Sequence, residues 1–182
     1  KSKSLYPKRP MIISKASLEE ILACRERRAK TQRTLLAHHR SVACFTMNIP
    51  GEIKHTPLIE FAFRHGVVQF EALLPAPAKK IIACAPTGCE AFFAFDIAAG
   101  RIKHAALAVE EGARAGRLYD IDVLDDVGEK LSRGEERRCI VCGGPVRACA
   151  RSRAHGLEEL LLRVDSILCE FAAQKLAGYA HD

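Results

Sequence analysis

Two aspartates separated by one residue, Asp120 and Asp122, form the pattern that most directly indicates chemistry in this sequence. They fall within residues 118–124, a run that predicts a β-strand. Side chains alternate between the faces of a strand, so both carboxylates would project from one face, roughly 6–7 Å apart. Like charges at that distance repel unless a cation lies between them. Mg²⁺ takes one or two carboxylates together with substrate phosphates, so the pair predicts a metal platform for nucleotidyl transfer. The alternative is a solvated strand face.

Cations in an apolar helix stripe are the second chemical signal. Ser17 and Glu20 match a capping box and predict a helix from there to about residue 39. Its apolar stripe comprises Leu18, Ile21, Leu22, Ala29 and Leu36. Arg25 and Gln32 fall in the middle of this stripe and Arg28 at its edge. A cation in an apolar stripe is costly unless it is paired. Arg25 therefore either extends its head group to solvent or meets an internal carboxylate, or it faces an anionic ligand at the edge of the core.

Three cysteines and a histidine form the third signal. The spacing Cys139-x2-Cys142-x6-Cys149-x5-His155 is typical of a small zinc knuckle. The arginines around it (Arg137, Arg138, Arg147, Arg151 and Arg153) then allow a rival function, a zinc-containing basic nucleic-acid-binding protein. Few aromatic residues stand among them to stack on bases, which counts against that function. Packing as small core residues and a reactive thiol are the other two interpretations.

The elements that must position these residues are helices and strands without strict alternation. Strands are expected at 41–49, 81–85, 91–97 and 118–124, and helices at 17–39, 57–74 and 156–177, the second interrupted or ended near His65-Gly66. Residues 101–111 favour a strand, although their alanines allow a helix. This order predicts an α+β fold with a mixed or antiparallel sheet flanked by helices. The acidic pair adds the expectation of a nucleotidyltransferase-like arrangement. We expect a single domain over 17–182, preceded by a flexible basic arm over 1–16.

Composition limits the class of protein. A chain of 182 residues with 48% hydrophobic and 27% charged residues can build one globular core. The net charge of +6 favours an anionic partner. No apolar run approaches the roughly 20 residues that cross a bilayer, and no signal-peptide pattern is seen. We therefore expect a cytoplasmic protein without membrane contact, with its eight cysteines as reduced thiols.

The segment Gly116-Arg117-Leu118-Tyr119-Asp120-Ile121-Asp122-Val123 resembles the signature of the holo-citrate lyase synthase family, the phosphoribosyl-dephospho-CoA transferases of citrate lyase. The resemblance extends over nearly the whole chain from residue 18. Further matching fragments, in the family's order, are Arg25-Glu26-Arg27-Arg28 with Gln32, Phe45-Thr46, Pro50-Gly51, Ile53-Lys54, His65-Gly66-Val67, Gly88-x-Glu90-Ala91-Phe92-Phe93, Glu110-Glu111 and Arg138-Cys139-x2-Cys142-x6-Cys149-Ala150-Arg151-x3-His155. The chain departs from the family at Ala113-Arg114-Ala115, where His-Pro-Leu is frequent.

The resemblance implies a reaction. A serine of the apo acyl carrier protein (gamma) subunit of citrate lyase attacks the phosphorus next to the ribose of 2′-(5″-triphosphoribosyl)-3′-dephospho-CoA. Diphosphate leaves and a phosphodiester remains. The basic surface would steer the acidic carrier, and nucleic acid would have no part. A non-catalytic chaperone for the carrier protein is a third interpretation of the same fold.

The resemblance also implies roles for residues. Asp120 and Asp122 would hold Mg²⁺ or Mn²⁺, and Arg117 beside them would offset charge on the phosphoryl oxygens. Glu110 or Glu111, expected on a strand next to the pair, would be a further metal ligand or a general base; the alternative is a charged pair flanking a turn. The candidate donor-binding residues are Arg25, Arg28, Gln32, Lys54 and Arg151.

Overall fold

A four-stranded antiparallel sheet forms the centre of the protein. The computed structural model describes residues 14–179. The strands are β1 (Ser41–Met47), β2 (Lys79–Ala85), β3 (Gly88–Phe95) and β4 (Tyr119–Leu124), in the order β2-β3-β1-β4. The prediction of an α+β fold with an antiparallel sheet is therefore confirmed. β4 is an edge strand, which leaves its outer side open to contacts from side chains.

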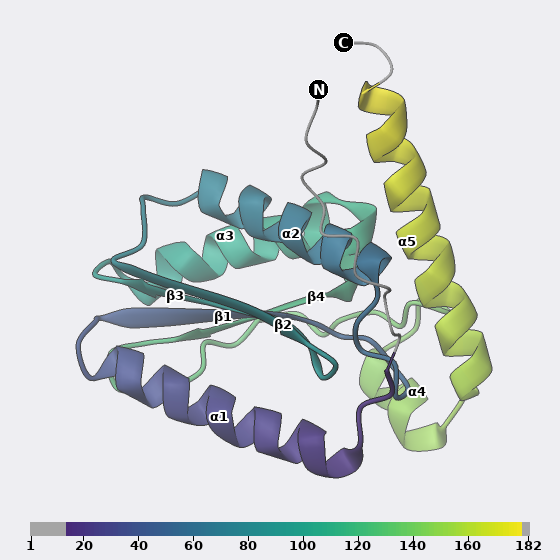
Figure 1. The fold of residues 1–182 in the computed structure, drawn as a ribbon, viewed down its shortest axis with the longest axis horizontal. Helices are drawn as coiled ribbons and strands as arrows, with labels where there is room; N and C mark the ends of the chain where they lie inside the picture. Colours follow the sequence, from purple (N-terminus) through teal and green to yellow (C-terminus); the bar gives the residue numbers. More distant parts are fainter. Residues whose placement is uncertain (1–13, 180–182) are drawn as a thin grey trace, which may run out of the picture.

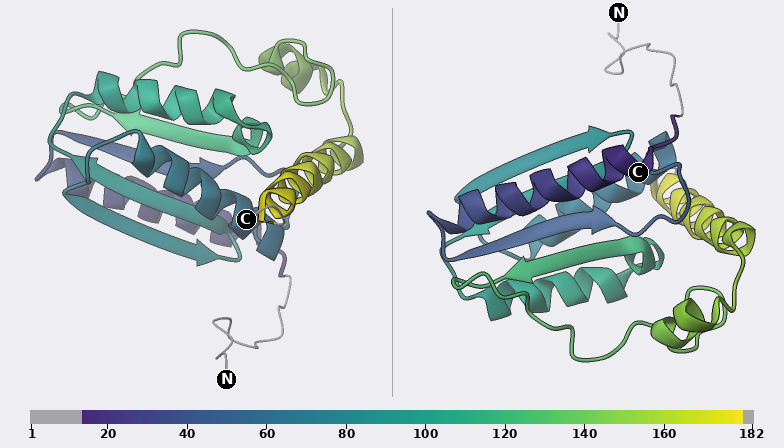
Figure 2. Two further views of the ribbon diagram at one scale, coloured as in Figure 1. Left: turned by 90° about the horizontal axis from the view of Figure 1, so that it is seen from above. Right: turned by 90° about the horizontal axis from the view of Figure 1, so that it is seen from below.

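Helices cover both faces of this sheet. α1 (Leu18–Leu36) lies across one face, and α2 (Pro57–Ala72) and α3 (Ala99–Gly112) lie across the other (Figures 1 and 2). The 3-10 turn η1 (Arg114–Leu118) leads into β4, and the short α4 (Val146–Ser152) precedes α5 (Leu157–Tyr179). α5 packs against α2 and η1 at one end of the sheet (Figure 1). None of the helices described within 14–179 is long and apolar enough to cross a membrane.

The start of α1 was predicted correctly, but its buried face was not. The Ser17 side chain accepts a hydrogen bond from the Glu20 backbone and Glu20 returns one to Ser17, which completes the capping box. No residue of the predicted apolar stripe is buried: Leu18 and Leu22 are exposed, at 72% and 48%, and the other three are half-buried. Cys24 and Leu35 are buried instead. The reason is that the helix turns Arg28 inward to meet a carboxylate on β3.

Two further predictions were wrong for packing reasons. α2 continues through Gly66. The glycine serves packing and does not end the helix, because a Cβ there would lie 2.6 Å from Tyr119 Cζ and 2.7 Å from Phe45 Cζ. Glycine is needed for this close approach of helix to sheet. Residues 101–111 belong to a helix rather than a strand, and Ile102, Ala106 and Val109 are among its buried residues at helical spacing.

The main core lies between the sheet and α2, α3 and α5. Phe45 forms edge or tilted contacts with Phe63, Phe70 and Tyr119 at centroid distances of 5.6, 6.2 and 5.1 Å. A smaller cluster under α1 contains Leu35, Val42, Cys44, Phe92 and Ala94. The α1 face of the sheet thus has little apolar cover, which leaves room for polar groups.

The expectation of eight reduced thiols is wrong for one pair. Cys84 and Cys89 oppose each other across the β2–β3 hairpin and are joined by a disulfide. Directly opposed residues of antiparallel strands bring their Cβ atoms close together, which permits the bond. The remaining six cysteines are free thiols. Of the predicted basic arm, residues 1–13 lie outside the described residues, whereas Ala16 is buried and donates its N–H to the Glu52 carbonyl at 2.9 Å.

Candidate functional site

Asp120 and Asp122 project from the α1 face of β4. Residues of this strand alternate between buried and half-buried, with Tyr119, Ile121 and Val123 turned into the core. The two aspartate side chains are 47% and 32% exposed. The predicted alternation is therefore confirmed, and both carboxylates share one face.

Polar residues on the neighbouring strands continue this face. In the strand register, Thr46 on β1 opposes Asp120 on one side and Glu90 on the other. Cys44 opposes Asp122, and burial raises the pKa of the Cys44 thiol to about 12. This thiol is therefore protonated at neutral pH and is a poor candidate for a nucleophile. The chemistry available at this face comes from carboxylates and cations.

A first hollow, of about 190 Å³, lies between α1 and the ends of β1 and β3. Its lining includes Arg25, Arg28, Lys54, Thr46 and Asp120. Three of the five predicted donor-binding residues thus meet in one place, Arg25 and Arg28 from α1 and Lys54 from the loop between β1 and α2. We call it the arginine hollow.

Positive charge is concentrated in the arginine hollow. Burial, and next the charge of Arg25, hold the pKa of Lys54 below its usual value. Like charges crowded together repel, and an anion placed between them relieves the repulsion. Arg28 is partly compensated, because its Nε lies 3.1 Å from Glu90 Oε2. Arg25 and Lys54 are therefore the better-placed cations for an incoming phosphate.

A second hollow, of about 410 Å³, lies along β4 and shares Asp120 with the first. We call it the acidic-pair hollow; its charged lining includes Asp120, Asp122, Glu110, Lys130 and Arg137. Lys130 Nζ lies 2.5 Å from Asp122 Oδ1, and Arg137 Nη2 lies 3.5 Å from Asp120 Oδ1. These side chains supply positive charge to each aspartate, so their mutual repulsion does not by itself require a divalent ion.

The donor set nevertheless fits Mg²⁺. Asp120 and Asp122 present half-exposed carboxylates into one hollow, and hard cations of this kind take one or two carboxylates plus substrate phosphates. A bound ion would compete with Lys130 for Asp122. Whether the pair holds Mg²⁺ or Mn²⁺ stays a proposal.

Glu110 and Glu111 lie on α3 and not on a strand as predicted. The Glu110 side chain is only 3% exposed, and its carboxylate accepts from the Ile121 backbone N–H at 2.8 Å. Its two oxygens also pair with Arg133 and with Arg137, the latter at 2.7 Å. Arg137 in turn donates to the Tyr119 carbonyl at 2.7 Å. Glu110 therefore seals the open edge of β4 and fixes Arg137 beside the acidic pair.

Four predicted site residues, Arg117, Glu111, Gln32 and Arg151, lie outside both hollows. Arg117, in η1, donates to the Arg138 carbonyl and lines a separate hollow of about 430 Å³. It precedes the strand and so does not stand beside the aspartates as expected; Arg137 occupies that place. Gln32 on α1 and Arg151 on α4 line neither hollow.

Sequence reasoning missed the cations that contact the carboxylates. Lys130, Arg133 and Arg137 follow β4 in an irregular segment, where no periodicity shows which side chains turn inward. A spacing of three to four residues between them was the only available signal. Their contacts depend on how that segment folds back along the edge of β4.

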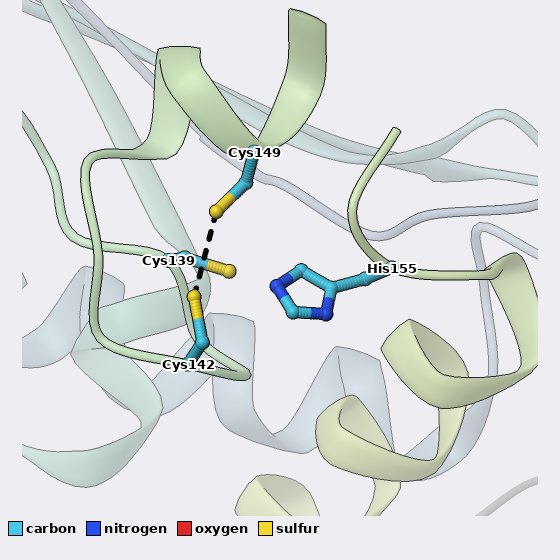
Figure 3. Close-up of side chains that lie close together, drawn as sticks. All are labelled: Cys139, Cys142, Cys149 and His155. Atoms are coloured by element: carbon cyan, nitrogen blue, oxygen red, sulfur yellow. Dashed lines mark hydrogen bonds between the residues drawn. The ribbon is translucent and has the colours of Figure 1, made fainter. Parts of the chain in front are cut away.

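The cysteines and histidine predicted from their spacing meet at one point. The ligand atoms of Cys139, Cys142, Cys149 and His155 all lie within 4.8 Å of one another (Figure 3). Cys139 is buried, Cys142 is exposed and Cys149 is intermediate. Core packing therefore explains Cys139 alone. We refer to the four residues as the Cys/His cluster.

Comparison with known proteins identifies the family. The family model described as apo-citrate lyase phosphoribosyl-dephospho-CoA transferase matches residues 16–171. Proteins of that name from Citrobacter koseri and Escherichia coli O157:H7 are each 33% identical over 161 residues, which cover 84% of this chain and 88% of theirs. Protein CitXG of Haemophilus influenzae is 32% identical over 163 residues, or 85% of this chain, but the chain spans only 35% of its length. The resemblance read from the motifs is confirmed, and the chain belongs to the apo-citrate lyase phosphoribosyl-dephospho-CoA transferase family.

Proposed function

We propose that this protein transfers the phosphoribosyl-dephospho-CoA group from 2′-(5″-triphosphoribosyl)-3′-dephospho-CoA to a serine of the apo acyl carrier protein subunit of citrate lyase. The serine oxygen forms a bond to the phosphorus next to the ribose. The bond from that phosphorus to the terminal diphosphate breaks, and diphosphate carries away the electron pair. The serine proton passes to a base or to solvent.

One observation carries this proposal: Asp120 borders both the arginine hollow and the acidic-pair hollow. A triphosphate that lies across this boundary would place some phosphates against Arg25 and Lys54. Its reacting phosphorus would then lie near the two aspartates. The same arrangement gives a nucleophile access from the open side of the acidic-pair hollow.

The cations of the chain would hold the donor and stabilise charge. Arg25 and Lys54 would bind phosphate oxygens, for which guanidinium and ammonium donors are suited. Arg137 lies 3.5 Å from Asp120 and is fixed there by Glu110. It would offset the charge that develops on the phosphoryl oxygens, the role first assigned to Arg117.

Mg²⁺ held by Asp120 and Asp122 would supply charge neutralisation for the leaving diphosphate. Lys130 pairs with Asp122, and we propose that this lysine moves to the leaving group when the donor binds. Glu110 has both oxygens engaged, so we assign it a positioning role in place of the earlier metal-ligand or base role. Glu111 is exposed and pairs with Arg133, so we assign it no part in positioning Arg137.

The experiment is to mix the protein with the apo carrier subunit, the donor and Mg²⁺, and to measure the intact mass of the carrier. The expected result is a gain of one phosphoribosyl-dephospho-CoA group with one diphosphate released per carrier. A carrier that binds the protein but gains no mass would favour the chaperone interpretation. A carrier that neither binds nor gains mass would refute the proposal.

A further inference from the structure

The Cys/His cluster lies in a part of the chain that lacks a core of its own. Between Val123 and Val164, the only buried hydrophobic residue of the described chain is Cys139. α4 contributes no buried residue at all. A segment of this length with so little buried apolar surface needs another source of stability, such as a bound metal.

We propose that the Cys/His cluster binds one structural Zn²⁺ ion. Three thiolates and one imidazole are a typical ligand set of closed tetrahedral zinc sites. A zinc ion with bonds of about 2.0–2.3 Å sets its ligand atoms about 3.4–3.8 Å apart. The sulfur atoms of Cys142 and Cys149 are 3.4 Å apart, and all four ligand atoms lie within 4.8 Å of one another. A small contraction would complete the site.

The orientation of His155 provides independent support. Its Nε2 atom is buried and has no hydrogen-bond partner among the described residues, and it points toward the three sulfurs (Figure 3). A buried polar atom without a partner is costly and calls for an explanation. Its Nδ1 atom lies 3.3 Å from Glu159 Oε2. A carboxylate on the far nitrogen is the usual arrangement behind a zinc-bound imidazole.

The backbone is shaped to bring these residues together. Cys139 and Cys142 flank a tight turn in which Gly143 donates to the Cys139 carbonyl at 3.0 Å and adopts a φ of +74°. After α4, Arg153 takes the left-handed conformation with a φ of 48°. This conformation is uncommon for a non-glycine residue, and it turns the chain so that His155 faces Cys149. A bound metal would offset that local strain.

The proposed site would also support the acidic-pair hollow. The Arg137 carbonyl accepts a hydrogen bond from the Val146 N–H at 3.1 Å. The backbones of Arg138 and Pro145 form an isolated antiparallel β-bridge. Both contacts close the loop that carries Cys139 and Cys142. Zinc would thus hold the backbone of Arg137 and Arg138 in place, and the Arg137 side chain reaches Asp120 from that backbone. The ion would stabilise this segment without touching the substrate.

The test is to purify the full chain without chelator, incubate it with Zn²⁺, remove the excess and measure zinc and iron per chain. We expect about one zinc and no iron. Cys142→Ser should bind less than about a tenth of that amount, because an exposed ligand is lost with little change in packing. Cys169→Ser is the matched control, since Cys169 is an exposed free thiol outside the cluster; it should bind zinc normally.

A second measurement does not depend on the variants. The wild-type protein reconstituted with Co²⁺ should show thiolate-to-metal charge transfer and the visible bands of a tetrahedral site. Removal of zinc should lower the thermal midpoint. The proposal is overturned if the wild-type chain binds no zinc, if it holds iron instead, or if Cys142→Ser retains full occupancy.

Discussion

Replacement of Glu110 by glutamine tests whether the edge of β4 is held as described. The substitution keeps an oxygen that can accept from the Ile121 N–H but removes the charge that faces Arg133 and Arg137. Removal of one partner of a buried ion pair costs about 3–5 kcal/mol. Arg133 and Arg137 are 20% and 23% exposed, so water can solvate them in part and the lower end applies. We predict a loss of about 3 kcal/mol in the free energy of unfolding.

The assay is urea unfolding together with thermal unfolding of Glu110→Gln. A loss of this size lowers the midpoint by about 6–12 °C for a chain of this length. Glu111→Gln is the matched control, because Glu111 pairs with the same Arg133 but its side chain is 66% exposed; it should lose less than about 0.5 kcal/mol. Similar small losses for both variants would refute the view that Glu110 fixes Arg137 at the sheet edge.

Three other outcomes follow from the site and the core. Arg25→Ala should weaken donor binding about tenfold, a change of about 1.4 kcal/mol. Arg27→Ala is the control, because Arg27 is exposed on α1 and does not line the arginine hollow, and it should leave the dissociation constant nearly unchanged. Equal effects of the two variants would place the donor elsewhere. The pKa of Lys54 is lowered by burial and by Arg25, so the lysine loses its charge as pH rises through that lowered value. Donor affinity should therefore fall over this pH range in the wild-type protein but not in Lys54→Ala. Identical pH profiles of the two proteins would contradict this role. Gly66→Ala should lower the free energy of unfolding in urea by about 1–2 kcal/mol, because overpacking against two buried rings exceeds the gain in helix propensity. Gly100→Ala is the control and should not lose this stability, because its Cβ would meet no atom within 4 Å. Equal stability of the two variants would contradict the packing described.

Local patterns predicted what depends on local geometry. The alternation at Asp120 and Asp122 follows from the pleat of a strand, and the start of α1 follows from the Ser17–Glu20 capping box, so both could be predicted. The spacing of the cysteines likewise predicted that they would meet. The α+β class followed from the order of helix and strand patterns.

Contacts between distant segments could not be predicted in this way. The buried face of α1 depends on Glu90, 62 residues beyond Arg28, and no helical periodicity contains that partner. Arg137 reaches Asp120 only because the segment after β4 folds back along the sheet edge. Glu110 belongs to a helix whose alanines are compatible with either periodicity. The missed contacts share a cause: they depend on tertiary packing.

The most direct test of the proposed site is carrier modification by Asp120→Asn and Asp122→Asn, each checked for native unfolding behaviour. Both aspartates are partly exposed, so each variant should lose less than about 1 kcal/mol of stability. We predict that the carrier is modified, as followed by its intact mass, at least about 100-fold more slowly by either variant than by the wild-type protein at saturating Mg²⁺. Wild-type rates in both folded variants would contradict the assignment of the acidic pair to phosphoryl transfer.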